Sequence, residues 1–411
     1  MQTRYIANLA RGLTLLIAIV GPFVVAHAAV KYKVLHDFTN GPDGDGNGGV
    51  TVDAKGNVYG ATLTGKYNNG LIFELTPSSD GKWSEMFLYS FPGGDGGESP
   101  QGKPLFDAAG NLYGVTEYGG KHKWGTVFRL TPSAKGWTHT ILYNFCSAAD
   151  CDDGEEPQSG VIMDSDGNLY GAAYAVFELR PQPDGWKETS LHNFTGNHSD
   201  GKDAISAVVR DSVGNLYGMT YLGGLQCGSS TCGTIYEISP QPDGKWKETI
   251  LLRFNGKNGQ FPLGALLLDG SGALYGTAEL GGTGGGVVFK MTPTGNGHWD
   301  YAIIHDFSGG TEGDIPVSGV VMDTNGNLYG TTGDGGNISG CGVLYKMSPS
   351  AKGKWRYTVL HRFGKINDGC APAGDLTIDS SGNLYGGTLL GGSHGFGTVY
   401  ELTPDPSPSP Q

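Results

Sequence analysis

One short word, Gly-Asn-Leu-Tyr-Gly or a close variant, recurs seven times along the chain at steps of roughly 50 residues. An apolar word of the type Val-Phe-Glu-Leu follows every copy, and six copies then carry a Trp and, eight residues later, a Phe. The seven copies begin at Gly56, Gly110, Gly167, Gly214, Gly272, Gly326 and Gly382. A period of this length is typical of folds in which each unit buries its core against its neighbours.

Each repeat is predicted to form four short antiparallel strands. An apolar run that ends in Asp, such as 319–323, gives the first strand, and the Asp-x-x-Gly-Asn segment after it is a turn. We expect the turn Asp to accept backbone N–H bonds and the Tyr of the repeat to pack within the blade. The second strand starts at Leu-Tyr-Gly, the third is the Val-Phe-Glu-Leu word, and the fourth runs from the Trp to the Phe. This pattern predicts an all-β fold, a seven-bladed β-propeller of four-stranded antiparallel blades.

The two ends of the repeat region predict that the blades close into a ring. The seventh repeat stops at 399–402 without a fourth strand, whereas 31–38 stands alone and matches the ends of the other fourth strands. We therefore expect 31–38 to complete blade seven, which removes two open sheet edges. An open solenoid would need polar capping repeats instead. The propeller then spans 30–404, and the Pro/Ser-rich residues 405–411 form a disordered tail.

The third repeat is shorter than the others between its second and third strands. Residues 171–175 must therefore make a tight connection where the other blades have a loop.

Composition excludes several other classes of protein. With 72 Gly among 411 residues the chain is unsuited to a helical bundle, and its Gly do not follow a collagen period. A hydrophobic content of 38%, with 20 Tyr, 16 Phe and 7 Trp, is enough to fill a core and argues against disorder. The formal charge of −13 disfavours nucleic acid as a partner.

Residues 1–28 have the three parts of a secretory signal peptide. Arg4 and Arg11 precede an apolar run, and the Ala-His-Ala of 26–28 is a cleavage site. The run is shorter than the ~20 residues that a membrane span needs, and no later stretch is apolar enough to be one. We therefore expect the protein to be exported and to have no transmembrane segment after signal cleavage. We also expect it to be a monomer.

All six cysteines follow the signal, in the part of the chain that would reach an oxidising compartment. Disulfides are therefore favoured over zinc, whose usual Cys and His spacing is absent. In a propeller, the loops between second and third strands share a face with the connections between blades. Cys341 and Cys370 fall on that face, which we call the loop face, and can bond there. The other cysteines form two Cys-x4-Cys pairs, Cys146 with Cys151 and Cys227 with Cys232.

The full repeated pattern, Gly-Asn-Leu-Tyr-Gly-x-Thr, Gly-Gly, Val-Phe-x-Leu-Thr-Pro, Trp and Leu-His-x-Phe in fixed order, covers 31–404 and resembles the GloVer tandem repeat. The resemblance implies an exported bacterial protein of a family whose members often carry a separate surface anchor. It implies no assigned activity and supplies no catalytic residues. Because no hydrophobic or sorting segment follows Pro404, we expect release into the periplasm or the medium.

Residues 43–48 match the first half of a calcium loop, through Asp43, Asp45 and Asn47. The second half fails, because Ala54 stands where a bidentate Glu is expected. Calcium therefore stays open as a cofactor beside a plain Gly-rich linker, and no other cofactor is expected.

Carboxylates on the loop face are the candidate catalytic residues. Glu117 and Glu279 occupy the same repeat position in blades two and five, and Asp334 lies one position further on in blade six. Paired carboxylates at a channel mouth can perform acid/base or glycosidic chemistry, although solvated loop acids are a common alternative.

Aromatic side chains in the same loops are the candidate ligand-binding residues, and packing over the inner strands is their alternative role. They are Tyr118, Trp124, Tyr221, His394 and Phe396.

Four histidines share one position of the fourth strand in different blades, and we expect them to be spread round the rim without forming a metal cluster. They are His36, His192, His305 and His361.

The sequence therefore favours an extracellular module that binds a glycan or protein on the loop face. A polysaccharide hydrolase or lyase on the same scaffold is the alternative, and a structural envelope protein is the third hypothesis.

Overall fold

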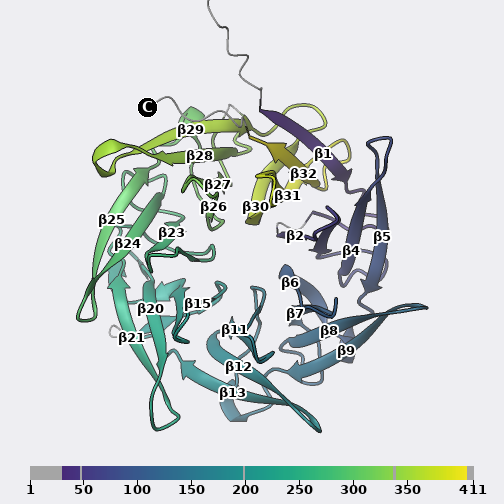
Figure 1. The fold of residues 1–411 in the computed structure, drawn as a ribbon, viewed down its shortest axis with the longest axis horizontal. Helices are drawn as coiled ribbons and strands as arrows, with labels where there is room; N and C mark the ends of the chain where they lie inside the picture. The colour runs from purple at the N-terminus through teal and green to yellow at the C-terminus, as the bar shows by residue number, and fades with distance from the viewer. Residues whose placement is uncertain (1–29, 47–48, 198–199, 337–338, 405–411) are drawn as a thin grey trace, which may run out of the picture.

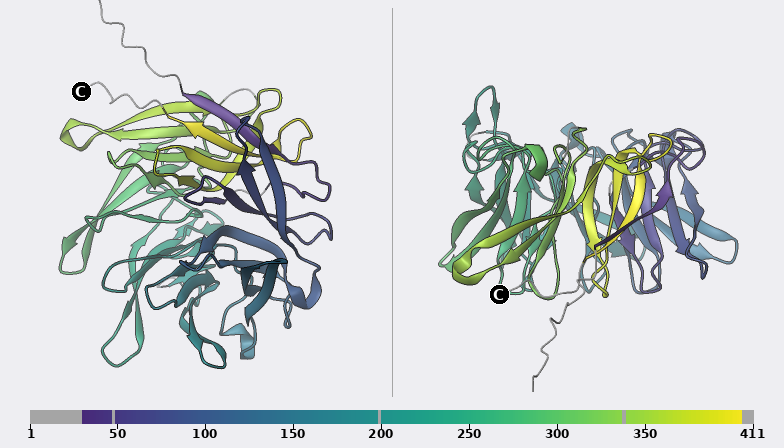
Figure 2. Two further views of the ribbon diagram at one scale, coloured as in Figure 1. Left: turned by 45° about the vertical axis from the view of Figure 1, so that its right-hand side comes forward. Right: turned by 90° about the horizontal axis from the view of Figure 1, so that it is seen from above.

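Seven four-stranded antiparallel sheets stand around a central axis in the computed structural model, as the blades of a propeller (Figure 1). The structure describes residues 30–46, 49–197, 200–336 and 339–404. The predicted signal peptide 1–28 and the tail 405–411 lie outside the described residues. Seen edge-on, the blades form a shallow disc with loops on both faces (Figure 2). The predicted fold class is confirmed.

In every blade the first strand lies nearest the axis and the fourth forms the outer wall (Figure 1). The first strands of blades one to seven are β2 (Val50–Val52), β6 (Glu98–Phe106), β10 (Ile162–Met163), β15 (Val209–Arg210), β22 (Leu267–Leu268), β26 (Val321–Met322) and β30 (Gly369–Ile378). The second strands are β3 (Val58–Thr62), β7 (Leu112–Tyr118), β11 (Leu169–Ala173), β16 (Leu216–Thr220), β23 (Leu274–Ala278), β27 (Leu328–Thr332) and β31 (Leu384–Gly391). The third strands are β4 (Leu71–Pro77), β8 (Thr126–Ser133), β12 (Ala175–Gln182), β20 (Thr234–Pro240), β24 (Val287–Gly295), β28 (Val343–Pro349) and β32 (Thr398–Thr403). The fourth strands are β5 (Trp83–Ser90), β9 (Gly136–Asn144), β13 (Gly185–Asn193), β21 (Trp246–Arg253), β25 (His298–Asp306), β29 (Trp355–Arg362) and β1 (Lys31–Asp37).

Short elements occupy some of the loops. They are β14 (Gly201–Lys202), β17 (Leu222–Gly223), β18 (Gln226–Cys227), β19 (Ser230–Thr231) and the 3₁₀ turns η1 (Gly94–Gly96), η2 (Ala149–Cys151), η3 (Gly310–Glu312) and η4 (Ala351–Gly353). None of the helices in the described part of the chain has the length and hydropathy of a membrane span.

The ring closes through strand β1, as the repeat pattern predicts. β1 pairs antiparallel with β32, so that Tyr32 lies opposite Leu402 and His36 opposite Val399. The strand order of blade seven is β1-β32-β31-β30, in which the two ends of the chain share one sheet (Figure 1). This pairing leaves neither end of the repeat array with a missing strand.

The Asp of each repeat caps the turn between the first and second strands. In blade six, Asp323 Oδ1 accepts the N–H groups of Asn325 and Asn327, both at 2.9 Å. The Tyr329 hydroxyl donates to the other oxygen, Oδ2, at 3.0 Å. Corresponding bonds hold the turns of the other six blades. The expected turn-capping role of the Asp is therefore confirmed.

The core lies between the blades and depends on the second Gly of the repeat word. The third-strand aromatic ring lies against this Gly: a Cβ added at Gly60 would be 2.5 Å from Phe73 Cζ, and one at Gly114 2.6 Å from Phe128 Cζ. The Phe that ends the fourth strand then packs edge-on against the same ring, as Phe91 does against Phe128. A side chain larger than hydrogen at this Gly would displace the ring from the core.

Blade three makes its tight connection with one residue. Strand β11 ends at Ala173, β12 begins at Ala175, and Tyr174 between them has a φ of 58°. The wall that second-to-third-strand loops build on the loop face is therefore lowest at blade three.

Candidate functional site

All three predicted disulfides are present, and they lie on the loop face. Cys146 bonds Cys151 and Cys227 bonds Cys232, each within its own loop. Cys341 in blade six bonds Cys370 at the start of blade seven. This last bond confirms that the loops between strands and the connections between blades share one face.

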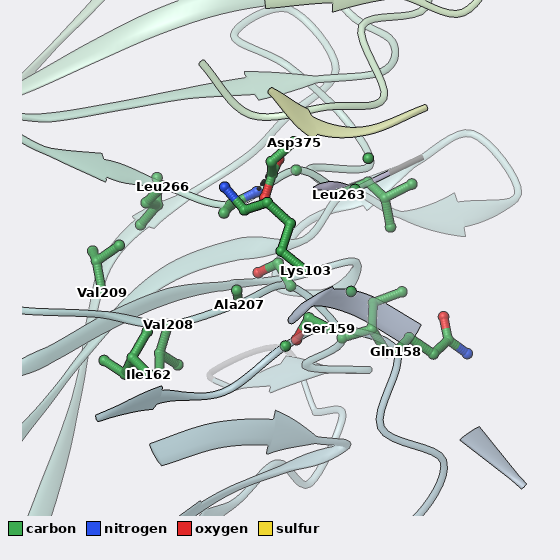
Figure 3. Close-up of a pocket in the computed structure, with 18 of the residues that line it drawn as sticks. Lys103, Gln158, Ser159, Ile162, Ala207, Val208, Val209, Leu263, Leu266 and Asp375 are labelled. Atoms are coloured by element: carbon green, nitrogen blue, oxygen red, sulfur yellow. Dashed lines mark hydrogen bonds between the residues drawn. The ribbon is translucent and has the colours of Figure 1, made fainter. Parts of the chain in front are cut away.

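A cavity of about 450 Å³ runs along the central axis (Figure 3). The first strands of the blades line it at successive depths, which we count back from the turn Asp. The residue six positions before the Asp lies at the mouth of the cavity on the loop face. The residue four positions before the Asp lies at the narrow middle of the cavity, which we call the waist. The residue two positions before the Asp lies beyond the waist, toward the opposite face. A strand advances about 3.3 Å per residue, so these levels span roughly 13 Å.

Small residues dominate the waist and allow the inner strands to approach closely. Five blades have Gly or Ala there, and the lining includes Gly160, Ala207 and Ala265. Beyond the waist the wall is aliphatic in four blades, where its residues are Ile162, Val209, Leu267 and Val321. The cavity is therefore narrow at the middle and apolar toward the face opposite the loops.

Two charged side chains occupy the waist (Figure 3). Lys103 of blade two passes over Gly49 of blade one, and its Nζ donates to the Leu376 carbonyl of blade seven at 3.3 Å. Asp375 of blade seven accepts the N–H of Gly319 in blade six at 2.7 Å. Asp375 also accepts the N–H of Ala265 in blade five at 3.4 Å. The pair therefore links five neighbouring blades while presenting opposite charges to the cavity.

Six of the seven connections between blades enter the mouth through a residue in the left-handed backbone conformation. Its φ ranges from 45° at Glu156 to 59° at Asp203 and Phe261, and the residues at this position are Ser99, Glu156, Asp203, Phe261, Ile315 and Ala371. The conformation recurs whatever the side chain, so it belongs to the propeller frame. The side chains themselves are polar in blades two to four and apolar in blades five to seven, which divides the mouth into two halves.

Glu117 lies in the polar half and is held by two amides. Gln101 Nε2 donates to one carboxylate oxygen at 2.7 Å, and Gln158 Nε2 donates to the other at 3.2 Å. Both glutamines line the cavity. The hydrogen bond to Glu117 raises the pKa of Tyr118 to about 12. Burial, with nearby acids, raises the pKa of Tyr174 to about 12. Neutral phenols and a fixed carboxylate thus meet at the mouth.

Glu279 belongs to a second cluster, at the junction of blades four and five. Its carboxylate lies 3.4 Å from the Tyr221 hydroxyl, and the Tyr221 ring stacks on Phe261 at 4.9 Å between centroids. Burial raises the pKa of Glu279 above its usual value. Part of the Tyr221 ring is therefore used for packing, and its hydroxyl faces the carboxyl group.

Asp334 is placed differently from the two glutamates. Its Oδ1 accepts the N–H of Gly335 at 2.7 Å, and its backbone pairs with Asp314. Burial and the charge of Asp334 raise the pKa of Asp314. Asp334 thus caps its own loop beside a second acid.

The remaining predicted ligand-binding residues are exposed. Trp124 is 40% exposed and Tyr118 41%, both in blade two, and Phe396 in blade seven is 38% exposed. The His394 ring lies 3.7 Å from Asp37, close to Ser393. These side chains form two exposed groups on the loop face, one on each side of blade one.

The candidate calcium residues make separate contacts. Asp43 accepts the N–H groups of Thr39 and Gly41 at 2.9 and 3.1 Å, whereas Asp45 Oδ1 accepts the N–H of Thr64 at 3.0 Å. Asn47 lies outside the described residues. Each Asp therefore stabilises its own piece of the connection between blades seven and one.

Sequence reasoning missed the residues that line the cavity itself. At the waist position, Lys103 and Asp375 are the two charged residues among seven repeats that otherwise have Gly or Ala. If the seven repeats had been aligned with one another at the turn Asp, these two charged residues would have stood out against the Gly and Ala of the other five. Gln101, Gln158 and Glu156 would have emerged in the same way.

Fold and cavity together define a closed repeat propeller with a lined central channel. The Gloeobacter/Verrucomicrobia repeat profile matches residues 22–175, 175–298 and 225–409, and the chain belongs to this family. No curated protein matches the chain in sequence.

Solved structures superpose on the chain at low sequence identity. PorZ, an essential surface component of the type-IX secretion system of Porphyromonas gingivalis, superposes with a TM-score of 0.47 and 13% identity. The match covers 86% of this chain and 46% of PorZ. A Dyadobacter fermentans protein of unknown function superposes with a TM-score of 0.46 and 12% identity over 91% of this chain and 98% of its own. At this level of similarity the comparison concerns the fold alone.

Proposed function

We propose that the protein is an exported binding module that holds an extracellular glycan at the loop-face mouth of its channel. The observation that carries the proposal is the grouping of a fixed carboxylate, two amides and exposed aromatic rings at one mouth. Glu117 is oriented by Gln101 and Gln158, and Tyr118 and Trp124 extend from the same blade. Below them lies a cavity of about 450 Å³.

This combination suits the chemistry of a sugar. Aromatic rings bind the C–H faces of a pyranose, and carboxylates and amides exchange hydrogen bonds with its hydroxyls. The low wall at Tyr174 leaves room for a chain to pass sideways over the mouth. The mouth therefore favours a glycan over a protein ligand, which would need a larger contact surface of about 800 Å² on each partner.

Export of the module is supported by its cysteines. Every cysteine of the chain is paired in a disulfide. Such bonds persist in the bacterial periplasm or outside the cell and are rare in the cytosol. We expect the mature protein to act there as a monomer.

Catalysis on a polysaccharide is the second candidate function, and Glu279 is the observation that favours it. A carboxyl group whose pKa is raised by burial, facing a phenol at 3.4 Å, is suited to donate a proton to a leaving group. The first function requires only that the site holds the sugar, whereas the second also requires turnover.

Glycan-array binding by the mature chain tests the first function. Trp124→Ala is expected to weaken binding by about fivefold or more, because a stacked ring contributes about 1 kcal/mol or more. Phe87→Ala is the matched control, because Phe87 is 41% exposed on the outer wall, away from the mouth. Glu117→Gln keeps an acceptor and is expected to retain binding.

The outcomes separate the two functions. Equal binding by the wild type, Trp124→Ala and Phe87→Ala would contradict the loop-face site, and the absence of any bound glycan would contradict the proposed function. Polysaccharide turnover that is lost in Glu279→Gln would establish the second function instead.

A further inference from the structure

The fourth strands of neighbouring blades meet at corresponding positions along the outer wall. Positions in each fourth strand are counted from its Trp; β1 has no Trp, and Val30 occupies the equivalent position. The residue six positions after the Trp in one blade lies against the residue two positions after the Trp in the next blade. We call each such meeting of two blades a seam. The pairs that interact in this way are Tyr89 with His139, Tyr143 with Glu188, His192 with Glu248, His305 with Tyr357, His361 with Tyr32 and His36 with Glu85.

Three of these contacts are ring stacks. The centroids lie 4.3 Å apart for Tyr89 and His139, 4.1 Å for His305 and Tyr357, and 3.8 Å for His361 and Tyr32. In these seams the packing of two flat rings fills the space between the blades.

Two other seams place a histidine between two carboxylates. His36 Nε2 lies 3.5 Å from Glu85 Oε1 and 3.6 Å from Asp43 Oδ2. His192, Asp200 and Glu248 repeat the arrangement between blades three and four, with 3.4 Å from His192 Nε2 to Asp200 Oδ1. In each group the three ligating atoms lie within 4.8 Å of one another. The one other group of three such side chains in the described chain contains Cys146 and Cys151, whose sulfurs are already bonded to each other.

Buried polar atoms in these two seams have no hydrogen-bond partner. They are Nε2 of His36 and Oε1 of Glu85 in the first group and Oε1 of Glu248 in the second. Leaving such an atom unpaired in the interior is costly, and a bound cation would give each of the three a partner. Glu188 Oε1 and His305 Nε2 are unpaired in other seams as well, but among the described residues no set of three ligating side chains converges on them.

The aspartates, by contrast, are fixed by their surroundings. Asp43 accepts backbone N–H groups of the connection after β1, and Asp200 accepts the N–H groups of Thr195 and Gly201 at 2.8 and 2.7 Å. A carboxylate oriented by outer hydrogen bonds is typical of a metal ligand.

The spacing of the ligating atoms distinguishes a cation from a direct hydrogen bond. Atoms bound tetrahedrally at about 2.0–2.2 Å from a cation lie about 3.3–3.6 Å apart. A hydrogen bond would instead hold a nitrogen and an oxygen about 2.7–3.2 Å apart. The distances of 3.5 and 3.6 Å around His36 fall in the first range. The 3.4 Å between His192 and Asp200 is a long hydrogen bond and also fits the first range.

We propose that His36, Asp43 and Glu85 form one site for a divalent cation of the zinc class, and that His192, Asp200 and Glu248 form a second. One imidazole and two carboxylates suit zinc, whereas calcium prefers oxygen ligands alone. Three protein ligands leave a fourth position for water. The first site joins the closing strand β1 to β5, and the second joins β13 to β21.

Zinc binding to the mature chain, prepared without a polyhistidine tag and stripped with chelator, tests the proposal. Calorimetric titration is expected to give two bound zinc equivalents per chain. His36→Gln is expected to remove one equivalent, His192→Gln the other, and the double variant both. Cobalt(II) should give the visible absorption of a tetrahedral site in the wild type and lose it in the double variant.

Two matched controls keep the test specific. Glu188→Gln changes a glutamate at the same strand position as Glu85, but its partner is Tyr143, so two equivalents should remain. His361→Gln removes a histidine equivalent to His36 whose neighbour is Tyr32, and two should remain again. Circular dichroism confirms that each variant is folded.

Several results would contradict the two proposed zinc sites. No bound zinc in the wild type, or two equivalents still bound by the folded double variant, would overturn the proposal. Loss of zinc from the two control variants would also overturn it, because binding would then reside elsewhere. One equivalent in the wild type, abolished by one of the two substitutions, would overturn the other site.

Discussion

The closing strand β1 borders two seams that are built in different ways. Toward blade six, Tyr32 stacks on His361, whose Nε2 lies 2.9 Å from Asp368, and the Cys341–Cys370 disulfide crosses the same pair of blades. Toward blade one, His36 faces the carboxylate of Glu85 at 3.5 Å without a ring stack. We call these the blade-six seam and the blade-one seam.

One side chain accounts for most of the difference. Tyr32 and Glu85 occupy the same position of their strands, and each faces a histidine and an aspartate from the neighbouring blade. The phenol ring leaves the histidine free to bond the aspartate. The carboxylate instead adds a second negative charge, and burial together with Asp43 raises the pKa of Glu85 to about 8. The histidine of the blade-six seam is therefore satisfied by Asp368, whereas the blade-one seam needs a proton or a cation.

Deletion of residues 30–38 removes β1 from both seams and should have the largest effect. It exposes the edge of β32 and removes the buried Phe38, whose ring packs against Phe73 of blade one. We expect loss of the single cooperative melting transition and self-association through the open edge, measured by calorimetry and light scattering. Deletion of 405–411 is the control and should change neither. A monomer of unaltered melting temperature after the first deletion would contradict ring closure.

Replacement of Cys341 and Cys370 by Ser weakens the blade-six seam alone. The disulfide closes a loop of 29 residues, so its loss should lower the free energy of unfolding by about 3–4 kcal/mol. The pair Cys146 and Cys151 closes only 5 residues, and its replacement should cost about 2 kcal/mol. Urea denaturation measures both. Equal losses would mean that the disulfide across the two blades contributes no more than a local one.

Tyr32→Ala tests the ring stack of the same seam. The ring contacts His361, Phe363 and Tyr400, so truncation should cost about 3 kcal/mol in unfolding free energy. Tyr32→Phe is the control: the hydroxyl is buried without a hydrogen-bond partner, and its removal should be nearly neutral. If Tyr32→Phe were as destabilising as Tyr32→Ala, the hydroxyl rather than the stack would hold the seam.

The seam between blades two and three gives the smallest effect, and it depends on pH. Burial and the charge of Asp153 raise the pKa of Glu188 from 4.5 to about 7. The folded state therefore binds a proton more tightly than the unfolded state, and this contribution to stability is present below pH 4.5 and lost as the pH rises through 7.

Glu188→Gln should remove that dependence. At pH 8 the variant should be more stable than the wild type by about 1–2 kcal/mol, and at pH 4 the two should be equal. Thermal unfolding across this pH range measures the difference. A wild-type stability that rises from pH 5 to pH 8 relative to Glu188→Gln would show the sign to be wrong.

Most of the fold could be predicted from the sequence because each repeat contains the residues that begin and end its own strands. The turn Asp, the Gly-Asn that follows it and the Phe that ends the fourth strand act within one blade, so their roles follow from local spacing. Ring closure followed from a comparison of 31–38 with the other fourth strands, and the Cys341–Cys370 bond followed from the loop face.

The contacts between blades could not be predicted in the same way. The histidines were expected to lie apart, and they do not meet one another. His36 and His192 instead meet carboxylates from the next repeat, and that partner depends on the stagger between neighbouring sheets. The same limit hid Lys103, whose side chain passes over blade one to reach blade seven. A single repeat does not contain the information that sets such partners.

The left-handed residue at six of the seven blade connections has a consequence for how the family can diversify. Because the backbone there is the same for Glu156 as for Ile315, duplication can copy the frame and later exchanges can alter one sector of the rim at a time. Members of the family with other residues at these places would keep the same ring while changing the chemistry of its rim.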